Sequence, residues 1–193
     1  MVRYGPEELE RFLLEIDREL EKPVSIVVIG GAAVALGYGS KRATKDIDLW
    51  PDLRATRPFW DAVARVKQRT GIAIPISPTP VAEAPERFEE RLQRYPLRGA
   101  KRLTVLLPER HDLVMMKTAR GETPDIEATI DIHRQAPLDP DVLVQRYSEM
   151  IGIVTGPPSR FRLSFLSMID AVFGEKVAAE VDARIPRARQ RRN

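Results

Sequence analysis

The sequence predicts a mixed α/β fold of the α+β kind, a mixed β-sheet flanked by helices with a helical C-terminal part. Two aliphatic runs, VSIVVI and RLTVLL, are typical of buried strands. Amphipathic helical patterns lie between the strand candidates of residues 1–107, whereas residues 108–182 are mostly helical in pattern. We therefore expect a core at 1–107, a helical part of the same unit at 108–182, and a basic, disordered tail at 183–193.

Local patterns predict the elements of the first part in order. Pro6 suits the first turn of a helix, and apolar residues at helical spacing extend that helix over residues 6–21. A strand at 24–29 then ends at a Gly-Gly pair, where a short helix begins. The next predicted elements are a strand at 45–50, a helix at 56–69, a strand at 72–76, a proline-rich loop at 75–85, a helix at 86–95 and a strand at 102–107. Pro75 assigns its strand to a sheet edge because proline has no N–H to donate.

Helical patterns dominate the second part of the chain. Four helices are predicted there, at 111–120, 124–135, 139–150 and 160–185. The third of them begins with an acidic Asp-Pro-Asp start, which suits a helix N-terminus.

Composition excludes several classes of protein. With 43% hydrophobic and 31% charged residues, the 193-residue chain is typical of one globular domain and not of a disordered protein. The absence of cysteine excludes disulfides, thiolate metal sites and a cysteine nucleophile. No apolar run approaches the roughly 18 residues of a membrane span, and the N-terminus lacks a signal-peptide pattern. We expect a cytoplasmic protein without a membrane partner.

Two aspartates in an apolar segment, Asp46 and Asp48, indicate a metal site. Side chains alternate faces along a strand, so both carboxylates project on one face while Ile47 and Leu49 point into the core. Neighbouring carboxylates repel each other unless a cation neutralises them. Mg²⁺, or Mn²⁺ in its place, prefers such oxygen ligands and completes its shell with substrate phosphates.

The glycine pair Gly30-Gly31 suits the other half of a nucleotide site. Glycine lets the backbone approach a ligand closely, and the helix that begins there offers unpaired N–H groups and the positive end of its dipole. Carboxylates on one side and amides on the other would hold the triphosphate of an NTP.

This arrangement of strand, Gly-Gly, short helix and Arg-x-Thr-x-Asp-x-Asp resembles the core of nucleotidyltransferases related to DNA polymerase β. More narrowly, it is similar to the small bacterial nucleotidyltransferases of toxin–antitoxin modules, AbiEii-like and DUF6036-type. The matching residues are Gly30, Gly31, Arg42, Thr44, Asp46 and Asp48. A second block, DLVMMKTARGETPDIEA, resembles the segment in which those proteins carry a lysine on a helix and a following aspartate, here Lys117 and Asp125.

The resemblance implies the roles of these residues. Asp46 and Asp48 would bind the metal and, with Lys117 and Asp125, form the catalytic set, while Gly30, Gly31, Arg42 and Thr44 would bind the nucleotide. The chain departs from the pattern in its third carboxylate, because the strand RLTVLL carries no acid. Glu109 and Asp112 follow that strand, and Asp125 or Glu127 are the other candidates; the resemblance favours Asp125.

The implied activity is Mg²⁺-dependent transfer of a nucleoside monophosphate from an NTP to an RNA, tRNA among the candidates, or to a protein. The resemblance also implies the toxin of a bacterial toxin–antitoxin pair, with a cognate antitoxin as partner. Two alternatives are a catalytically degenerate protein that binds nucleotide or RNA and an antibiotic adenylyltransferase. The basic end of the chain, with five arginines and no acid in ARIPRARQRRN, suits phosphate contacts or a solvated terminus.

Each candidate residue also has a structural interpretation. Asp46 and Asp48 can be surface acids with basic neighbours, and the glycines can form a tight turn for packing alone. Lys117 can be a surface residue of an amphipathic helix, and Asp125 suits a helix cap.

His111 and His133 form no metal-ligand spacing and no recognisable catalytic triad, so we assign neither to a site.

Overall fold

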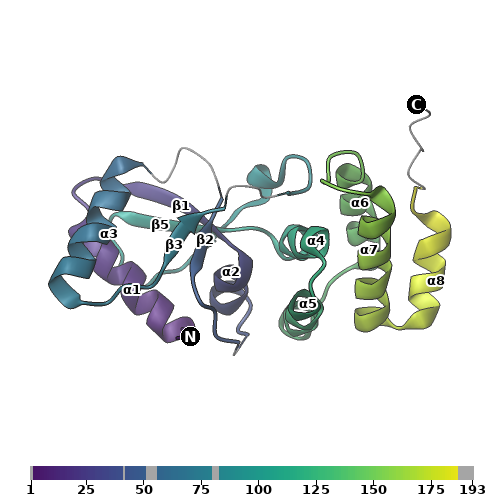
Figure 1. Ribbon diagram of the computed structural model, residues 1–193, viewed down its shortest axis with the longest axis horizontal. Helices are drawn as coiled ribbons and strands as arrows, with labels where there is room; N and C mark the ends of the chain where they lie inside the picture. The colour runs from purple at the N-terminus through teal and green to yellow at the C-terminus, as the bar shows by residue number, and fades with distance from the viewer. Residues whose placement is uncertain (1, 41, 51–55, 80–82, 187–193) are drawn as a thin grey trace. The chain divides into compact units, whose positions relative to one another are not determined.

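A computed structural model of the chain describes residues 2–40, 42–50, 56–79 and 83–186 (Figure 1). These residues form two compact units. The first comprises Met1–Ala82 and Arg91–Pro108, and the second comprises Glu83–Glu90 and Glu109–Asn193.

The first unit is built on a mixed sheet that has five strands in the described residues, in the order β3-β2-β1-β5-β4. The strands are β1 (Val24–Ile29), β2 (Ile47–Leu49), β3 (Ile76–Pro78), β4 (Gln93–Tyr95) and β5 (Leu103–Leu107). β1 runs parallel to β5 and antiparallel to β2, while β2 is parallel to β3 and β4 antiparallel to β5. This sheet, together with the helices, confirms the predicted α+β class.

Three helices of the first unit bury their apolar sides in its core. They are α1 (Pro6–Glu19), α2 (Gly30–Gly37) and α3 (Arg57–Thr70). α1 and α3 lie side by side (Figure 1), and α1 also packs against α2 and β5. The predicted periodicity is confirmed in α1, where Leu9, Phe12, Leu13 and Ile16 are buried at helical spacing.

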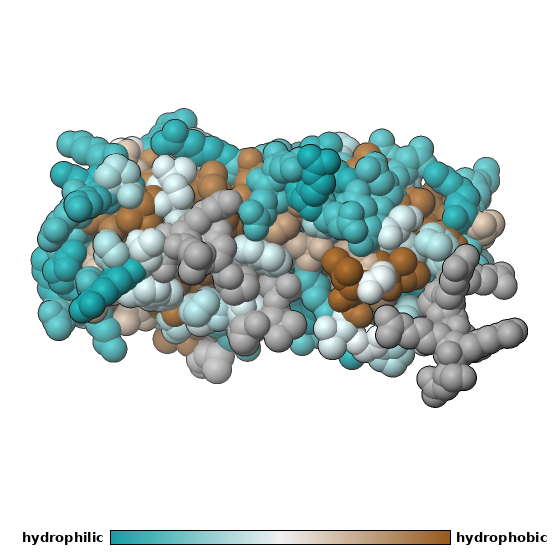
Figure 2. Space-filling model, turned by 90° about the horizontal axis from the view of Figure 1, so that it is seen from above, coloured by the Kyte–Doolittle hydropathy of each residue, from teal (hydrophilic) through white to brown (hydrophobic). Residues whose placement is uncertain are grey.

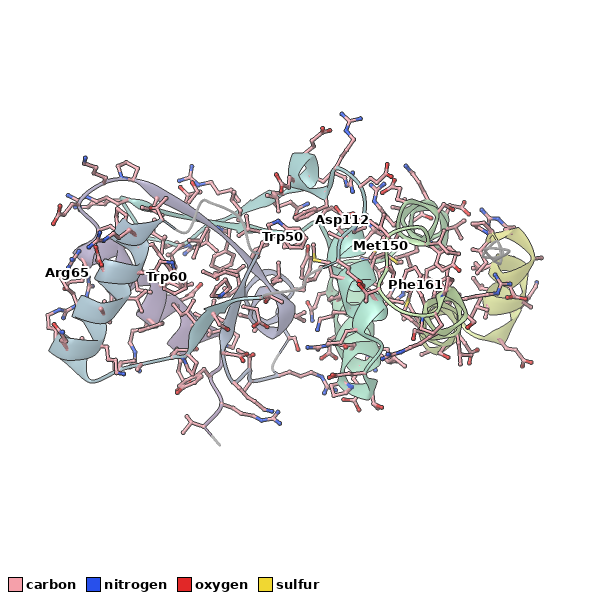
Figure 3. The ribbon with its side chains drawn as sticks, turned by 45° about the horizontal axis from the view of Figure 1, so that its top comes forward. Trp50, Trp60, Arg65, Asp112, Met150 and Phe161 are labelled. Carbon is pink, nitrogen blue, oxygen red and sulfur yellow. The ribbon has the colours of Figure 1, made fainter. Side chains whose placement is uncertain are left out.

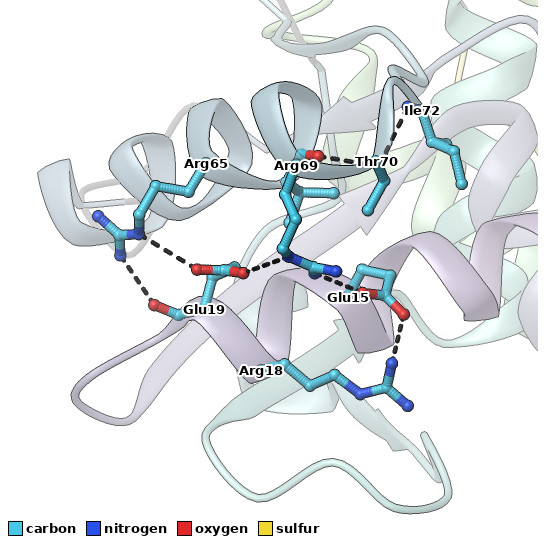
Figure 4. Close-up of polar contacts among 8 residues, drawn as sticks. Glu15, Arg18, Glu19, Arg65, Arg69, Thr70 and Ile72 are labelled. Carbon is cyan, nitrogen blue, oxygen red and sulfur yellow. Dashed lines mark hydrogen bonds and ion pairs between the residues drawn. The ribbon is translucent and has the colours of Figure 1, made fainter.

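Charged side chains join the exposed edges of α1 and α3 (Figure 4). Arg69 donates from Nε to Glu19 Oε1 at 2.8 Å and from Nη2 to Glu15 Oε2 at 2.5 Å, and Arg65 donates to the Glu19 carbonyl oxygen at 2.8 Å. The Arg69 hydrogen bond lowers the pKa of Glu15, although burial acts in the opposite direction. Because Arg69 is half exposed, we expect these ion pairs to add little to the free energy of unfolding. They determine which parts of α1 and α3 lie against each other.

The second unit is helical. Its helices in the described residues are α4 (Arg110–Arg120), α5 (Thr123–Gln135), α6 (Pro140–Met150), α7 (Pro158–Phe173) and α8 (Glu175–Arg184). α4 packs against α5, α6 and α7, and α8 packs against α7. The Tyr147 ring stacks on Phe161 and Phe165, with ring centroids 5.0 and 4.6 Å away. Phe161 and Met150, labelled in Figure 3, are buried in this core.

The surface is mostly polar on the face that Figure 2 shows, where apolar side chains form separate small patches. In the described residues, the large apolar side chains that are exposed are Val2, Ile153 and Leu163. No helix in the described ranges is long and apolar enough to cross a membrane.

The helix predicted at 86–95 is wrong. The segment forms a short 3-10 helix, Phe88–Arg91, and then strand β4. β4 pairs with β5 through the register Gln93 to Leu107 and Tyr95 to Val105. Pairing with the edge of β5 therefore outweighs the local helical pattern, because strand formation depends strongly on the neighbouring strand.

Two further elements differ from the prediction. The strand expected at 72–76 instead comprises Ile76–Pro78, because these are the residues that pair with β2. The pairing begins at Pro75, whose carbonyl oxygen accepts the Ile47 N–H at 2.8 Å. The strand does lie at a sheet edge, as expected. The helix predicted at 160–185 is interrupted at Gly174, whose φ of +87° is not helical.

The predicted basic tail falls largely on residues 187–193, which lie outside the described residues. Arg184, at the end of α8, donates to Asp141 Oδ1 at 2.7 Å.

Candidate functional site

The carboxylate of Asp48 lies against Gly30. Ile29, the last residue of β1, is opposite Asp48 in the antiparallel β2, so the acid is adjacent to the turn into α2. Gly30 has a φ of +67°, and a Cβ atom added there would lie 2.6 Å from Asp48 Oδ2. Both the backbone conformation and the close contact require glycine. The glycine turn and the strand acid therefore form one site.

Thr44 connects the glycine turn to the segment that carries Asp46. A Cβ atom on Gly31 would lie 2.8 Å from Thr44 Oγ1, so these residues are also in close contact. The Thr44 hydroxyl donates to the Asp46 carbonyl oxygen at 3.2 Å. The backbones of Thr44 and Tyr4 exchange two hydrogen bonds, of 2.7 and 3.0 Å, which hold this segment in place. A direct contact of Thr44 with nucleotide stays a prediction.

Burial alternates through the segment that holds the two acids. Ile47 and Leu49 are fully buried, whereas Asp46 and Asp48 are half-buried. Asp46 directly precedes β2, so the alternation puts both acids on the accessible side of this segment. Two partly accessible carboxylates on one side are suited to a divalent cation.

The first turn of α2 supplies the other half of the site. Its N-cap residue, Ile29, has an apolar side chain, so no side chain caps the helix and no acid lies in the first turn. Backbone N–H groups at such an end are available to an anion, which the helix dipole also favours. Arg42 is exposed on the loop after α2, where its N–H donates to Ser40 Oγ at 3.2 Å.

Asp46 and Asp48 lack a third acid nearby in the part of the chain that the structure describes, where no group of three or more histidine or acidic side chains could hold a metal ion. Mg²⁺ commonly uses only one or two carboxylates and takes its other ligands from water and substrate phosphates. The donor set therefore fits a cation whose shell the triphosphate completes.

Two of the candidates for the third acid are engaged within the second unit. Glu109 caps α4 by accepting the His111 N–H at 2.8 Å. Asp112 is fully buried, with Oδ1 3.0 Å from Arg146 Nε. Neither carboxylate is available for a metal in this arrangement.

The comparison with known protein families matches residues 7–168 to a family described as nucleotidyltransferase of unknown function (DUF6036). The chain belongs to this family. The match contains the glycine turn, the two acids and the lysine block, in agreement with the resemblance seen in the sequence. No curated protein and no solved structure matches the chain.

Lys117 and Asp125 of this DUF6036 protein form a buried ion pair in the second unit. Lys117 Nζ donates to Asp125 Oδ1 at 3.1 Å, and their side chains are 5% and 3% exposed. The interpretation of Lys117 as a surface residue is therefore wrong. The hydrophobic periodicity of α4 did not reveal its burial, because the partner that makes burial possible comes from another helix.

Asp125 receives two further partners. Arg120 donates from Nη2 to Oδ1 at 2.6 Å and from Nε to Oδ2 at 2.9 Å, and the Glu122 N–H donates to Oδ2 at 3.3 Å. Asp125 thus caps the N-terminus of α5, which was one of its two interpretations. Burial acts to raise the pKa of Asp125, but Arg120 and Lys117 outweigh it and lower that pKa. The catalytic assignment of both residues stays a prediction.

Substitutions in this pair separate a structural role from a catalytic one. We expect Asp125→Ala to lower the free energy of unfolding by about 3–5 kcal/mol, because Lys117 stays buried without this carboxylate. Lys117→Met should cost less than half as much, since Asp125 keeps Arg120 and the Glu122 N–H. Urea unfolding measures both changes. Transfer activity lost by a fully folded Lys117→Met protein would support catalysis, and activity that follows the folded fraction would contradict it.

The two histidines have structural contacts that the sequence did not reveal. His111 is buried, with Nδ1 2.9 Å from Glu109 Oε1, and its Nε2 accepts the Asp139 N–H at 2.9 Å. It therefore joins the N-termini of α4 and α6. His133 Nδ1 accepts the Leu138 N–H at 3.1 Å.

Proposed function

We propose that this DUF6036 protein is a Mg²⁺- or Mn²⁺-dependent nucleotidyltransferase that transfers a nucleoside monophosphate from an NTP to an RNA or protein acceptor. The contact between Asp48 and Gly30 carries the proposal, because a carboxylate of a kind suited to a cation lies beside a helix N-terminus that no side chain caps. These are the two groups that a triphosphate and its metal require. Membership of the family supports the same reaction class.

Each residue of the proposed site has a separate role. Asp46 and Asp48 would hold the cation, which when bound supplies positive charge to the reacting phosphates. The N–H groups of the first turn of α2 and the Arg42 guanidinium would bind and orient the triphosphate. The acceptor hydroxyl oxygen then bonds to the α-phosphorus while the bond to pyrophosphate breaks. The acceptor proton passes to a carboxylate of the pair or to water.

The biological setting is the finer part of the proposal. By the resemblance alone, the protein acts as the toxin of a bacterial toxin–antitoxin pair, and a cognate antitoxin is its partner. Growth arrest on expression, relieved by a neighbouring gene, would test this role separately from the chemistry.

Label transfer tests the reaction. The protein is incubated with each α-³²P-labelled NTP, Mg²⁺ or Mn²⁺, and total RNA or protein extract, and the labelled product is separated. We expect Asp46→Asn and Asp48→Asn each to reduce transfer by at least about 100-fold, because the charge that neutralises the cation is lost. Asp61→Asn on α3 is the matched control, since Asp61 is 54% exposed and pairs only distantly with Arg57 at 3.8 Å.

Equal activity of the Asp48→Asn and Asp61→Asn proteins would contradict the proposed site. Label that appears on an aminoglycoside and on no RNA or protein would instead identify the antibiotic adenylyltransferase.

A nucleotide-binding protein without turnover is the second candidate. The observation in its favour is that no third acid accompanies Asp46 and Asp48 among the residues the structure describes. Calorimetry distinguishes it, because NTP binding that depends on Asp48, with no transfer to any acceptor under either metal, would support the binder.

A further inference from the structure

A basic segment of the first unit is not explained by the nucleotide site. Residues 91–108 carry five lysines and arginines and no acid, whereas the net charge of the whole chain is only +3. The segment forms β4, a loop and β5, and β4 is the last strand at its edge of the sheet. One side of this hairpin is therefore free of any neighbouring strand in the described sheet.

Four of these basic side chains are exposed, and we refer to them as the hairpin basic surface: Arg94, Arg98, Lys101 and Arg102. Among the described residues, none of the four forms an ion pair with an acid. The arginines between α1 and α3 differ in this respect, because Arg65 and Arg69 are paired with Glu15 and Glu19. The hairpin basic surface thus has positive charge that the protein does not neutralise by such pairs.

The loop that carries this charge is well ordered by its contacts. The buried carboxylate of Asp17 accepts the backbone N–H groups of Lys101, Arg102 and Leu103, at 2.6 to 3.0 Å. The Tyr95 hydroxyl, on β4, donates to Glu10 of α1. Asp17 binds the backbone of the loop, while the basic side chains remain exposed. Because the loop backbone is already held, only the side chains lose conformational freedom when the loop binds a partner.

We infer that the hairpin basic surface binds the phosphate backbone of an RNA acceptor. An array of unpaired cations on a fixed loop complements the regular negative charge of a nucleic acid strand. A protein acceptor offers no comparable regular charge. The inference rests on the proposed function only in naming the bound RNA as the acceptor.

The position of the surface predicts which part of the acceptor it contacts. Val24, at the start of β1, pairs with Leu103, so the loop lies at the opposite end of β1 from Gly30. Six residues of strand span about 20 Å, at about 3.3 Å each. Phosphates that contact this loop should therefore lie about 20 Å or more from the nucleotide that is modified.

Binding of a fluorescein-labelled 12-nucleotide single-stranded RNA, followed by anisotropy from 50 to 200 mM salt, tests the inference without Mg²⁺ or NTP. The test protein carries Arg94→Gln, Arg98→Gln, Lys101→Gln and Arg102→Gln. We expect its affinity to fall at least about tenfold and the slope of log affinity against log salt to decrease by about 2 to 3, since each lost phosphate contact removes about 0.7.

A control with the same change in charge carries Arg57→Gln, Lys67→Gln, Arg134→Gln and Lys176→Gln, all exposed positions outside the hairpin. It should keep most of the affinity, as should Asp48→Asn, which is expected to lose transfer. A 3-nucleotide RNA should bind the unchanged protein more weakly than the 12-nucleotide RNA, because it offers fewer phosphates to the hairpin basic surface. Thermal melts confirm that all variants are folded.

Several results would overturn the inference: no binding of RNA by the unchanged protein at 50 mM salt, an equal loss in the control variant, or tighter binding of polyglutamate than of RNA. The last would assign the surface to an acidic protein. RNA binding is measured without Mg²⁺ or NTP, so a negative result here contradicts only the RNA-binding surface. The proposed transfer reaction is tested separately, by the activity of Asp48→Asn.

Discussion

Replacing Gly30 with alanine is expected to reduce nucleotidyl transfer by at least about 100-fold, because a displacement of about 1 Å at a reacting centre has effects of this size. A Cβ atom there would lie 2.6 Å from Asp48 Oδ2, so the carboxylate must move. The φ of +67° adds a backbone cost of about 1–2 kcal/mol for any L-residue. Transfer assays at saturating NTP, together with urea unfolding, measure the two effects separately.

Gly71→Ala is a closely matched control. Gly71 has almost the same backbone conformation, with a φ of +69°, but nothing lies within 4 Å of a Cβ atom placed on it. The two variants should therefore share the same backbone cost in stability, whereas only Gly30→Ala should displace Asp48 and lose transfer. Similar activities in both variants would mean that the carboxylate position beside Gly30 is irrelevant to the reaction.

Replacing Asp17 is expected to have the largest effect on stability in the first unit. Its side chain is buried and holds the loop before β5 through three backbone N–H groups. We expect Asp17→Ala to lower the free energy of unfolding by about 3 kcal/mol or more, since several donors would be left without an acceptor. Asp17→Asn should recover only part of this, because its amide nitrogen is itself a donor. Urea unfolding at pH 7 measures both.

The contribution of Asp17 should also depend on pH. Burial acts to raise its pKa, but the hydrogen bonds from Leu103, Arg102 and Lys101 outweigh burial and lower it. A carboxyl group whose pKa is lower in the folded state stabilises the protein above its unfolded pKa, about 3.9, and loses this contribution as the pH falls through the folded value.

The stability difference between the unchanged protein and Asp17→Asn should therefore be constant from pH 7 to about 5 and shrink below about pH 4. Other carboxyl groups with lowered pKa, such as Glu15 and Asp125, are present in both proteins and cancel in the difference. A difference that stays constant to pH 3 would contradict this account.

Local sequence patterns were sufficient for most of the fold. The aliphatic run of β1 and the apolar spacing of α1 predicted both elements to within two residues, because each pattern directly reflects burial on a sheet or a helix face. The segment at 86–95 was predicted wrongly, since charge spacing suggests a helix while the free edge of β5 selects a strand at Gln93–Tyr95.

The sequence by itself determined that this protein has a Gly-Gly turn after a buried strand and two acids that alternate with apolar residues. Period-two alternation and the freedom of glycine are properties of the local chain, so these features can be read without coordinates. Only the tertiary structure decided that Asp48 lies over Gly30, that Lys117 is buried against Asp125 and Arg120, and that Asp17 holds the basic loop. Those contacts join residues from different elements, and their distances depend on how the strands pair and the helices pack.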